Sequence, residues 1–386
     1  FIIKSKLYNA DFVRDRTEGF DNFLKEIERQ DVDHLAKVAG VDKQLVKEAA
    51  IAYATAKNSM EFHGLGVTEH EQGSKTVMLI ADLAMITGNI GRKGVGVNPL
   101  RGQNNVQGAA DMGCQPHQGA GYFEVSDEKN QKFYSEKYGV THPTKAGLKI
   151  PQMFDAAIKK DIKGIWIIGE DIVQTDPNSA HVVEAMNSLE LLVVQEIFMS
   201  ETAKLATVVL PGTTFLEKDG TFTNTERRVQ RVNRAVPPLP GTKPDGVIVT
   251  DMMQKLGFDQ PDYDADQVLA EIADIVPFFK GITRERLGKF GLQWPVKEDG
   301  TDTQILHTEE FKLGKGRLKS FDWKESTEIT NNQKDYPLIL TTSRVLQHYN
   351  AATMTRRTNN INIVDEDVLL IHPKDAADRD LNTGDI

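Results

Sequence analysis

The chain has 386 residues, of which 39% are hydrophobic and 26% are charged. This balance supports a folded core and excludes wholesale disorder. The 46 basic and 56 acidic side chains give a formal net charge of −10, so the whole chain has no electrostatic attraction to nucleic acid or to an anionic membrane. Its one cysteine, Cys114, excludes an internal disulfide and any cluster or zinc site built from this chain's thiolates alone.

Targeting signals are not recognisable in this sequence. No apolar run reaches the ~18–20 residues of a membrane-spanning helix, and the start does not resemble a signal peptide. The sequence begins with Phe1 and stops soon after a turn signal at residues 382–385. We therefore expect an interior piece of a longer protein, located in the cytoplasm, with the periplasm left open.

The first hundred residues combine helical patterns with one strand. Residues 45–54 carry apolar side chains at helical spacing and predict a helix. Residues 61–67 predict a strand loosened by glycines. A buried helix is predicted over residues 77–86, with Ser74 as its N-cap and Gly88 closing its end.

A regular pattern follows between residues 163 and 211. Three short apolar runs, at residues 164–168, 191–194 and 207–210, lack polar alternation, and a helical pattern at 180–189 separates the first two. Such runs predict a parallel sheet covered on both faces. Ligands of such sheets bind beyond the carboxyl ends of the strands, so we expect polar residues there to be functional.

The remaining sequence is less regular. Residues 218–224 predict a hairpin-like turn between β-formers, and residues 300–332 are polar and predicted to be irregular and exposed. Two helices are predicted at residues 247–256 and 264–275, the second with Asp264 as N-cap, and a last strand at 337–342.

One loop is unusually rich in residues that can approach a ligand. Residues 87–108 contain six glycines and four asparagines, and Arg101 lies among them. A guanidinium can bind a small carboxylate through two parallel hydrogen bonds. The spacing alone favours a glycine-rich surface loop with a solvated arginine, because it is neither a dinucleotide fingerprint nor a phosphate loop.

Acidic residues follow the first strand of the predicted parallel sheet. Glu170, Asp171 and Asp176 can accept hydrogen bonds from the base edge or ribose of a nucleotide. Thr175 and Asn178 can cap a helix or bind phosphate. An acidic turn followed by a capped helix explains the same residues equally well.

Several strings of residues resemble one known family. The most specific is Arg-Gly-Gln-Asn-Asn-Val-Gln-Gly at residues 101–108, and further matches lie at 169–178, 194–203, 206–211, 217–228 and 348–357. Through them the whole chain resembles the large, catalytic subunit of molybdenum- or tungsten-dependent formate dehydrogenases, in the molybdopterin oxidoreductase superfamily.

The resemblance implies an α/β fold. It would contain two doubly wound, Rossmann-like parallel-sheet domains, part of a cluster-side domain and the start of a C-terminal β-barrel domain. Residues 1–103 would belong to the first pterin-binding domain and residues 104–215 to the second. Residues 216–335 would join the iron–sulfur-side domain, and residues 336–386 would begin the truncated barrel.

The resemblance also implies a chemistry. In this family two pterin guanine dinucleotides hold molybdenum or tungsten, formate is oxidised to CO2, and electrons pass to a 4Fe–4S cluster. Arg101 matches the arginine that holds formate, and Gln103 is expected near the pterin. One guanine dinucleotide would contact Gly169, Glu170, Asp171, Thr175, Asp176, Gln195 and Ile197, and the second pterin would contact Ser343, Arg344, His348 and Thr353.

No residue of this chain is expected to ligate the metal. The family's metal-ligating cysteine or selenocysteine and its cluster cysteines lie in an N-terminal part that this sequence lacks. The implied partners are formate, CO2 and electron-transfer subunits with iron–sulfur clusters or flavin, and we expect the piece alone to be inactive. Two alternatives stay open: a related oxidoreductase with another substrate such as nitrate, and a non-catalytic molybdopterin-fold subunit of a respiratory complex.

Overall fold

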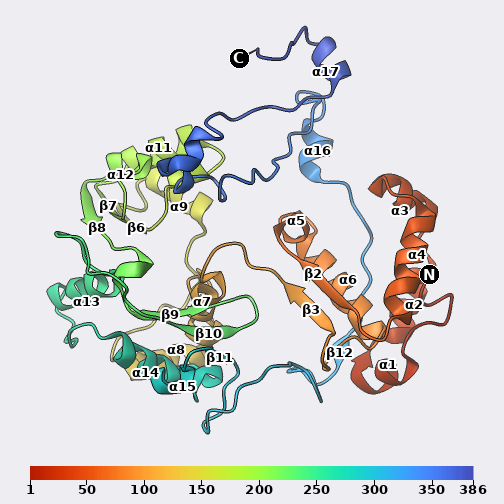
Figure 1. Cartoon of the computed structure of the whole chain (residues 1–386), viewed down its shortest axis with the longest axis horizontal. Helices are drawn as coiled ribbons and strands as arrows, with labels where there is room; N and C mark the ends of the chain where they lie inside the picture. The colour runs from red at the N-terminus through yellow and green to blue at the C-terminus, as the bar shows by residue number, and fades with distance from the viewer. Residues whose placement is uncertain (386) are drawn as a thin grey trace. The chain divides into compact units, whose positions relative to one another are not determined.

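A computed structural model describes residues 1–385 and divides the chain into two compact units. The first unit comprises Phe1–Lys149 and Thr213–Leu338, and the second comprises Ile150–Gly212 and the segment that starts at Ile339. The second unit therefore interrupts the sequence of the first. Its two segments are coloured yellow to green and blue in Figure 1. In the part of the chain that the structure describes, no helix is both long enough and apolar enough to cross a bilayer.

The N-terminal part of the first unit is mainly helical. Its elements are α1 (Ala10–Arg16), β1 (Thr17–Glu18), α2 (Phe20–Glu28), α3 (Val32–Ala39), α4 (Lys43–Thr55), β2 (Met60–His63), α5 (Leu65–Thr68), α6 (Gly73–Ile86) and β3 (Gly96–Pro99). Its core includes Val13, Phe23, Met85 and Leu318. β1 pairs in parallel with β12 (Gly316–Arg317), and β2 pairs in parallel with β3.

The predictions for this part are largely confirmed. α4 covers the helix predicted at residues 45–54, and Gly88 closes α6 with a left-handed φ of 69°. The N-cap prediction was wrong, because α6 begins at Gly73 and places Ser74 inside its first turn. α5 lies directly before it, and a Cβ on Gly73 would lie 2.1 Å from the carbonyl oxygen of Thr68. The predicted strand is shorter than expected, since the chain turns into α5 after His63.

The rest of the first unit surrounds an antiparallel sheet of order β11–β10–β9. Its elements are α7 (Val106–Asp111), β4 (Gln118–Gly119), β5 (Phe123–Glu124), α8 (Glu128–Tyr138), β9 (Gly220–Thr223), β10 (Arg228–Val232), α13 (Asp245–Lys255), α14 (Ala265–Ile275), α15 (Arg284–Leu287) and β11 (Leu292–Gln293). The later α16 (Thr327–Asn332) instead bonds the N-terminal part, where the N–H of Thr327 donates to Glu71. Its core contains Val229, Val276, Ile282 and Leu287. Both predicted helices are confirmed as α13 and α14, and the side chain of Asp264 caps α14.

Two predictions in this part need correction. Residues 220–223, expected within a turn, form β9, and the chain reverses over the next four residues instead. The side chain of Asn224 closes that reversal by accepting from the N–H groups of Glu226 and Arg228. The region 300–332 is mostly irregular, but β12 and α16 lie in it and Leu318 is buried.

The second unit contains a parallel sheet of order β6–β7–β8. Its elements are α9 (Ile150–Ile158), β6 (Gly164–Ile168), α10 (Ile172–Thr175), α11 (Ser179–Asn187), β7 (Leu191–Glu196), α12 (Glu201–Lys204), β8 (Val208–Pro211) and α17 (Pro373–Ala377). Buried apolar side chains of α9, α10, α11 and α12 pack with those of β6 and β7 in one core. The predicted parallel sheet and its intervening helix are confirmed.

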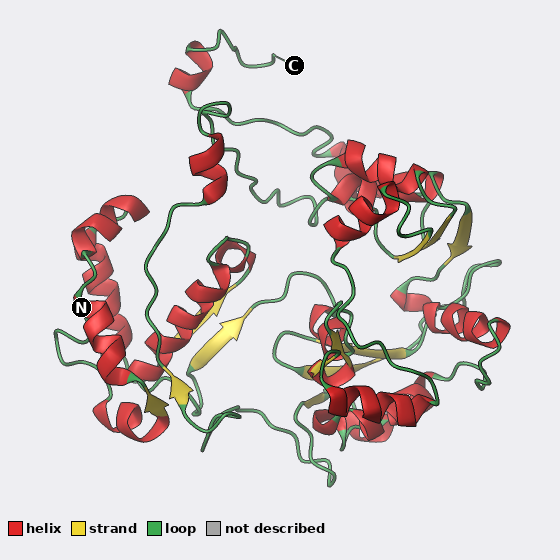
Figure 2. Cartoon of the chain, turned by 180° about the vertical axis from the view of Figure 1, so that it is seen from behind, coloured by secondary structure: helices red, strands yellow, loops and turns green. Residues whose placement is uncertain are grey.

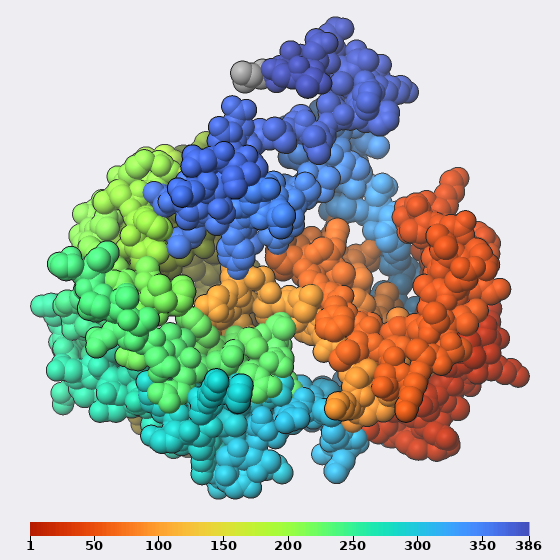
Figure 3. Space-filling model, viewed as in Figure 1, coloured from red at the N-terminus to blue at the C-terminus, as the bar shows by residue number. Residues whose placement is uncertain are grey.

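The last predicted strand does not form. Residues 337–342 are coil, and Leu338, Ile339 and Leu340 are 46%, 77% and 80% exposed. A strand needs a hydrogen-bonded neighbour, and nothing within residues 1–385 pairs with this segment. The C-terminal segment, blue in Figure 3, is visible at the surface.

Candidate functional site

Arg101 stands at the carboxyl end of a two-stranded parallel sheet. β2 and β3 pair in register from Met60 opposite Gly96 to His63 opposite Pro99, and Figure 2 shows the two strands side by side. The N–H of Leu100 donates to the carbonyl oxygen of His63 at 2.7 Å and extends the pairing by one residue. Arg101 thus occupies the kind of strand end at which α/β sheets bind ligands.

The hairpin of β9 and β10 holds the backbone of the Arg101 loop. The N–H of Arg101 donates to Oγ1 of Thr225 at 2.9 Å, and that hydroxyl donates to the carbonyl oxygen of Pro99 at 2.9 Å. At the other end of the loop, Oδ1 of Asn105 accepts from the N–H of Thr223 at 2.9 Å. The loop is therefore anchored on both sides of Arg101 and is not a loose surface loop.

The Arg101 side chain leads into a buried polar network. Its Nε donates to Oε1 of Gln107 at 3.0 Å, and Nε2 of Gln107 donates to Oδ1 of Asp111 at 2.8 Å. Asp111 accepts two further hydrogen bonds, from the hydroxyl of Tyr122 at 2.7 Å and from Nε1 of Trp294 at 2.9 Å. Asp111 has no exposed surface and Gln107 is 7% exposed, so this network is shielded from water.

The buried end of this network, at Asp111 and Tyr122, has shifted pKa values, whereas the other end, at Arg101, is exposed. Burial raises the pKa of Asp111, while hydrogen bonds from Tyr122, Gln107 and Trp294 and the positive charge of Arg101 act in the opposite direction. Burial also raises the pKa of Tyr122, and the Asp111 carboxylate beside it adds to that shift. The Arg101 residue itself is exposed.

The outer edge of the Arg101 guanidinium is open. Within residues 1–385, Arg101 donates hydrogen bonds from its backbone N–H and from Nε, and its two Nη groups make none. Two Nη groups on one planar edge match the two oxygens of a carboxylate. The neighbouring His63 is 7% exposed, and its Nδ1 has no hydrogen-bond partner among the described residues.

The acidic turn after β6 contains both exposed and buried polar side chains. Gly169 has a left-handed φ of 64°, and a Cβ there would meet nothing within 4 Å. Glu170 is exposed and accepts from the hydroxyl of Thr175 at 2.7 Å. Asp171 is buried, and its Oδ1 accepts from the N–H and hydroxyl of Thr202 at 3.0 and 2.7 Å. Asp171 therefore fastens this turn to α12, and Asp176 is half-buried beyond α10.

The end of β7 lies next to the end of β6. The N–H of Gly169 donates to the carbonyl oxygen of Gln195 at 2.9 Å, and Gln195 is 1% exposed. The N–H of Ile197 donates to Oε1 of Glu196 at 2.7 Å. Burial raises the pKa of Glu196. The residues predicted from the first two strands are therefore brought together at one edge.

The C-terminal segment contacts this same edge. The guanidinium of Arg357 lies 5.0 Å from the ring centroid of Phe198, directly after β7. Nε2 of His348 lies 2.6 Å from the carbonyl oxygen of Val364, so it donates there, and Nδ1 faces the Thr355 hydroxyl at 3.0 Å. Among the other predicted residues of this segment, Ser343 and Arg344 are exposed, Arg344 donates to Asn350, and Thr353 is half-buried.

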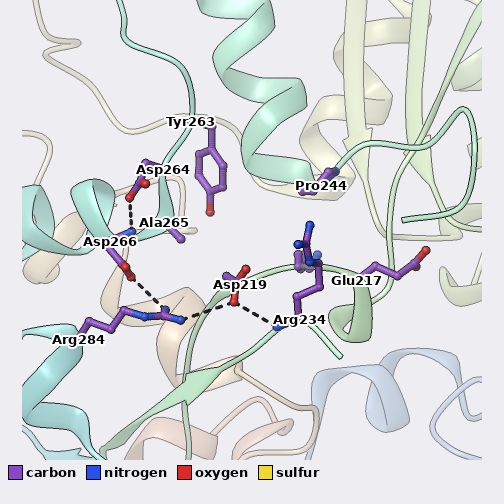
Figure 4. Close-up of a pocket in the computed structure, with 10 residues that line it drawn as sticks. Glu217, Asp219, Arg234, Pro244, Tyr263, Asp264, Ala265, Asp266 and Arg284 are labelled. Carbon is purple, nitrogen blue, oxygen red and sulfur yellow. Dashed lines mark hydrogen bonds and ion pairs between the residues drawn. The ribbon is translucent and has the colours of Figure 1, made fainter. Parts of the chain in front are cut away.

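A separate charged cavity lies elsewhere in the first unit. It has a volume of about 300 Å³ and is drawn in Figure 4. Its charges pair with one another: Arg284 lies 3.0 Å from Asp266 and 3.5 Å from Asp219. None of the predicted site residues lines it. Within the described residues, no three histidine, cysteine or acidic side chains group to hold a metal ion.

The residues that hold Arg101 were not predicted from the sequence. Gln107 and Asp111 stand four residues apart, which places them on one face of α7, so a helix prediction at 106–111 would have paired them. Trp294 is 183 residues from Asp111, and no local signal links the two. Gln103 lies in the exposed turn before α7, and its predicted place near a pterin is untested.

Comparison with known proteins decides the family. The family model described as molybdopterin oxidoreductase matches residues 17–255, well over half of the chain, and the one described as "Molydopterin dinucleotide binding domain" matches residues 338–386. This chain belongs to the molybdopterin oxidoreductase family. The α/β fold class is confirmed by the parallel sheets and by a structural similarity to acetylene hydratase from Pelobacter acetylenicus. That similarity has a TM-score of 0.69 at 19% identity and covers 99% of this chain and 57% of that one.

The curated relatives include proteins named formate dehydrogenases. The chain is 42% identical over 391 residues to the F420-dependent formate dehydrogenase subunit alpha of Methanocaldococcus jannaschii, covering 100% of this chain and 57% of that protein. It is 36% identical over 359 residues to formate dehydrogenase H of Escherichia coli, covering 92% of this chain and 50% of that one. The chain thus spans about half the length of the curated relatives it matches.

Proposed function

We propose that this chain is part of the catalytic subunit of a formate dehydrogenase, which oxidises formate to CO2 and can run in reverse. The observation that carries the proposal is the Arg101 guanidinium, held at a sheet edge with both Nη groups open. The similarity to proteins named formate dehydrogenases supports the choice of substrate.

Arg101 would bind and orient formate. Formate has two oxygens and one C–H bond, so a guanidinium that holds both oxygens directs the C–H bond away from itself. The buried Gln107 fixes the guanidinium at Nε and leaves the Nη edge for the substrate. When bound, the pterin-held molybdenum or tungsten would supply the acceptor for the two electrons of formate.

The residues at the ends of β6 and β7 fit a guanine dinucleotide. Glu170 offers an exposed carboxylate to the N–H groups of a base, and the open space at Gly169 allows close approach of a ligand. The proposed contacts on this side are Gly169, Glu170, Thr175, Asp176, Gln195 and Ile197, with Asp171 holding the turn. Ser343, Arg344, His348 and Thr353 are proposed for the second pterin, together with Gln103.

The finer parts of the proposal concern the whole protein. Partner subunits for electron transfer are proposed because relatives carry the name subunit alpha. The 4Fe–4S cluster is proposed from the family resemblance alone. The domain boundaries at residues 103, 215 and 335 and a cytoplasmic location stay predictions. Limited proteolysis and cell fractionation test these two predictions.

The test of the proposal compares substrates on the full-length protein. Purified protein with its metal content measured is expected to oxidise formate with a viologen dye as electron acceptor and to show no nitrate reduction. Activity with nitrate but not formate would assign another substrate. Stoichiometric metal without either activity, or no metal at all, would contradict the proposal in favour of a different or non-catalytic role.

A further inference from the structure

The Arg101 side chain is the exposed end of a buried chain of hydrogen bonds that starts at Asp111. Gln107 and Asp111 both belong to α7, and the amide of Gln107 bridges the Asp111 carboxylate and Nε of Arg101. Asp111 makes no direct hydrogen bond to Arg101 in the described residues. Beside the direct attraction between the two charges, the hydrogen-bonded route by which Asp111 acts on the Arg101 side chain passes through the Gln107 amide.

The chemistry of the carboxylate decides which way that amide faces. An ionised carboxylate only accepts hydrogen bonds, so Gln107 must present its NH2 group to Asp111 and its oxygen to Arg101. The reversed amide would place an acceptor against the carboxylate and a donor against the N–H of Arg101 Nε. Both contacts would then be repulsive, and an unmade hydrogen bond in a buried position is costly.

The carboxylate itself cannot turn away. Tyr122 donates to Oδ1 and Trp294 donates to Oδ2, from a segment before the inserted unit and a segment after it. The Tyr122 hydroxyl also accepts from Nε2 of Gln107 at 2.8 Å. Donors on both oxygens fix the plane of the Asp111 carboxylate and favour its ionised form.

We propose that Asp111 is a positioning residue for the substrate arginine: it sets the orientation of the Gln107 amide, which in turn holds the Arg101 guanidinium with its Nη edge facing outward. The inference rests on the proposed role of Arg101 in binding formate. It adds a specific cause for the pose of that arginine, namely a buried negative charge two hydrogen bonds away.

The first variant to test is Asp111→Asn in the full-length protein. In one orientation, the asparagine NH2 group faces the N–H of Trp294, and two donors meet. In the other orientation, the asparagine NH2 group faces Gln107, so the Gln107 amide must reverse and present its own NH2 group to Arg101. We expect kcat/KM for formate to fall about 10- to 100-fold, mainly through a higher KM, because formate loses a charge-assisted contact. Gln107→Met keeps Asp111 itself but removes both the acceptor for Arg101 and the donor to Asp111, and it is expected to raise KM similarly.

A second buried acid provides the matched control. Asp82 is 3% exposed, lies on α6 and accepts from the N–H of Lys319, with no link to Arg101. Asp82→Asn makes the same side-chain substitution at a buried position of the same unit and is expected to leave KM for formate unchanged.

A charge exchange tests the orientation argument directly. In the double variant Gln107→Glu with Asp111→Asn, the carboxylate introduced at position 107 accepts from Arg101 and from the new asparagine NH2 group, while the asparagine oxygen accepts from Trp294. Every donor again faces an acceptor, so the double variant is expected to recover most of the KM lost in Asp111→Asn. A purely structural role for Asp111 predicts no such recovery of KM.

A readout independent of formate separates this inference from the proposed function. In 15N-arginine-labelled protein, the Nε–H of Arg101 is assigned by its loss in Arg101→Lys. We expect its hydrogen exchange to accelerate at least tenfold in Asp111→Asn and to slow again in the double variant. Native exchange in Asp111→Asn would overturn the inference even if the protein oxidises formate. Accelerated exchange in Asp111→Asn, together with a native protein that does not oxidise formate, would support the role of Asp111 and refute the proposed function.

Discussion

Arg101→Lys is the most direct perturbation of the proposed site. Lysine keeps the positive charge but replaces a planar fork by a single ammonium group. In the structure the guanidinium uses Nε for Gln107 and leaves two Nη groups open. Lysine cannot bond Gln107 and both carboxylate oxygens of the substrate in one plane. The substitution therefore keeps the positive charge but loses the planar arrangement of donors.

The size of the effect follows from the bonds lost. One charge-assisted hydrogen bond to the carboxylate contributes about 1.5–3 kcal/mol, and the lost link to Gln107 adds about 0.5–1 kcal/mol of positioning. Together, a loss of about 2–4 kcal/mol corresponds to a fall in kcat/KM of roughly 30- to 1,000-fold. The metal content should not change, because Arg101 is not expected to ligate the metal.

The assay is steady-state formate oxidation by the full-length protein with a viologen dye, alongside metal analysis and a thermal melt. Arg92→Lys is a matched control, because Arg92 lies on the same glycine-rich loop and bonds Asn89 rather than the proposed substrate position. If Arg101→Lys retains kcat/KM within about threefold of the native protein, the role assigned to this guanidinium is refuted. A loss equal to that of Arg92→Lys would refute it too.

Two further predictions concern stability. Burial raises the pKa of Asp82 from 3.8 to about 7, so the folded state holds this proton more tightly and stability falls as pH rises from about 4 to 7. The free energy of unfolding should fall by about 1.4 kcal/mol per pH unit, and by at most about 4 kcal/mol in total. Chemical denaturation at several pH values should show that Asp82→Asn flattens this dependence. An unchanged dependence on pH would contradict the assignment to Asp82. A Cβ on Gly108 would lie 2.1 Å from Oδ1 of Asn105, whereas one on the helical Gly66 meets nothing within 4 Å. Gly108→Ala should therefore destabilise by about 1–3 kcal/mol and Gly66→Ala should stabilise by up to about 1 kcal/mol; equal melting shifts would show that the Gly108 contact relaxes freely.

The elements that could be predicted from sequence are those defined by local pattern. β6 and β7 are short apolar runs with a helix between them, and their parallel pairing follows from that pattern alone. The cap at Asp264 follows from one residue type at one position. The β9 hairpin was misplaced because its turn depends on the Asn224 side chain, whereas the glycine at 220, the usual turn signal, lies inside a strand.

The candidate site was only partly predictable. Arg101 was identified by resemblance, while its spacing alone favoured a solvated loop residue. Its restraint by Thr225 is a contact across 124 residues, and nothing in the sequence near either residue indicates it. The pattern of the acidic turn left ligand contacts and a capped turn equally open, and only the resemblance favoured ligand contacts. The structure shows that the buried Asp171 bonds Thr202. Local sequence could not indicate this, because burial depends on contacts between distant residues.

The long-range restraints on Arg101 have a common origin in the order of the chain. Gln107 and Asp111 precede the inserted second unit, while Thr225 and Trp294 follow it. The guanidinium can be held only after residues on both sides of the insertion have folded into one unit, because half of its restraints come from each side. A loop that carried Arg101 by itself would keep the charge but lose the fixed Nη edge, and recognition of a two-oxygen substrate depends on that edge. The specificity of the proposed site is therefore a property of the assembled first unit rather than of the loop sequence that makes it recognisable.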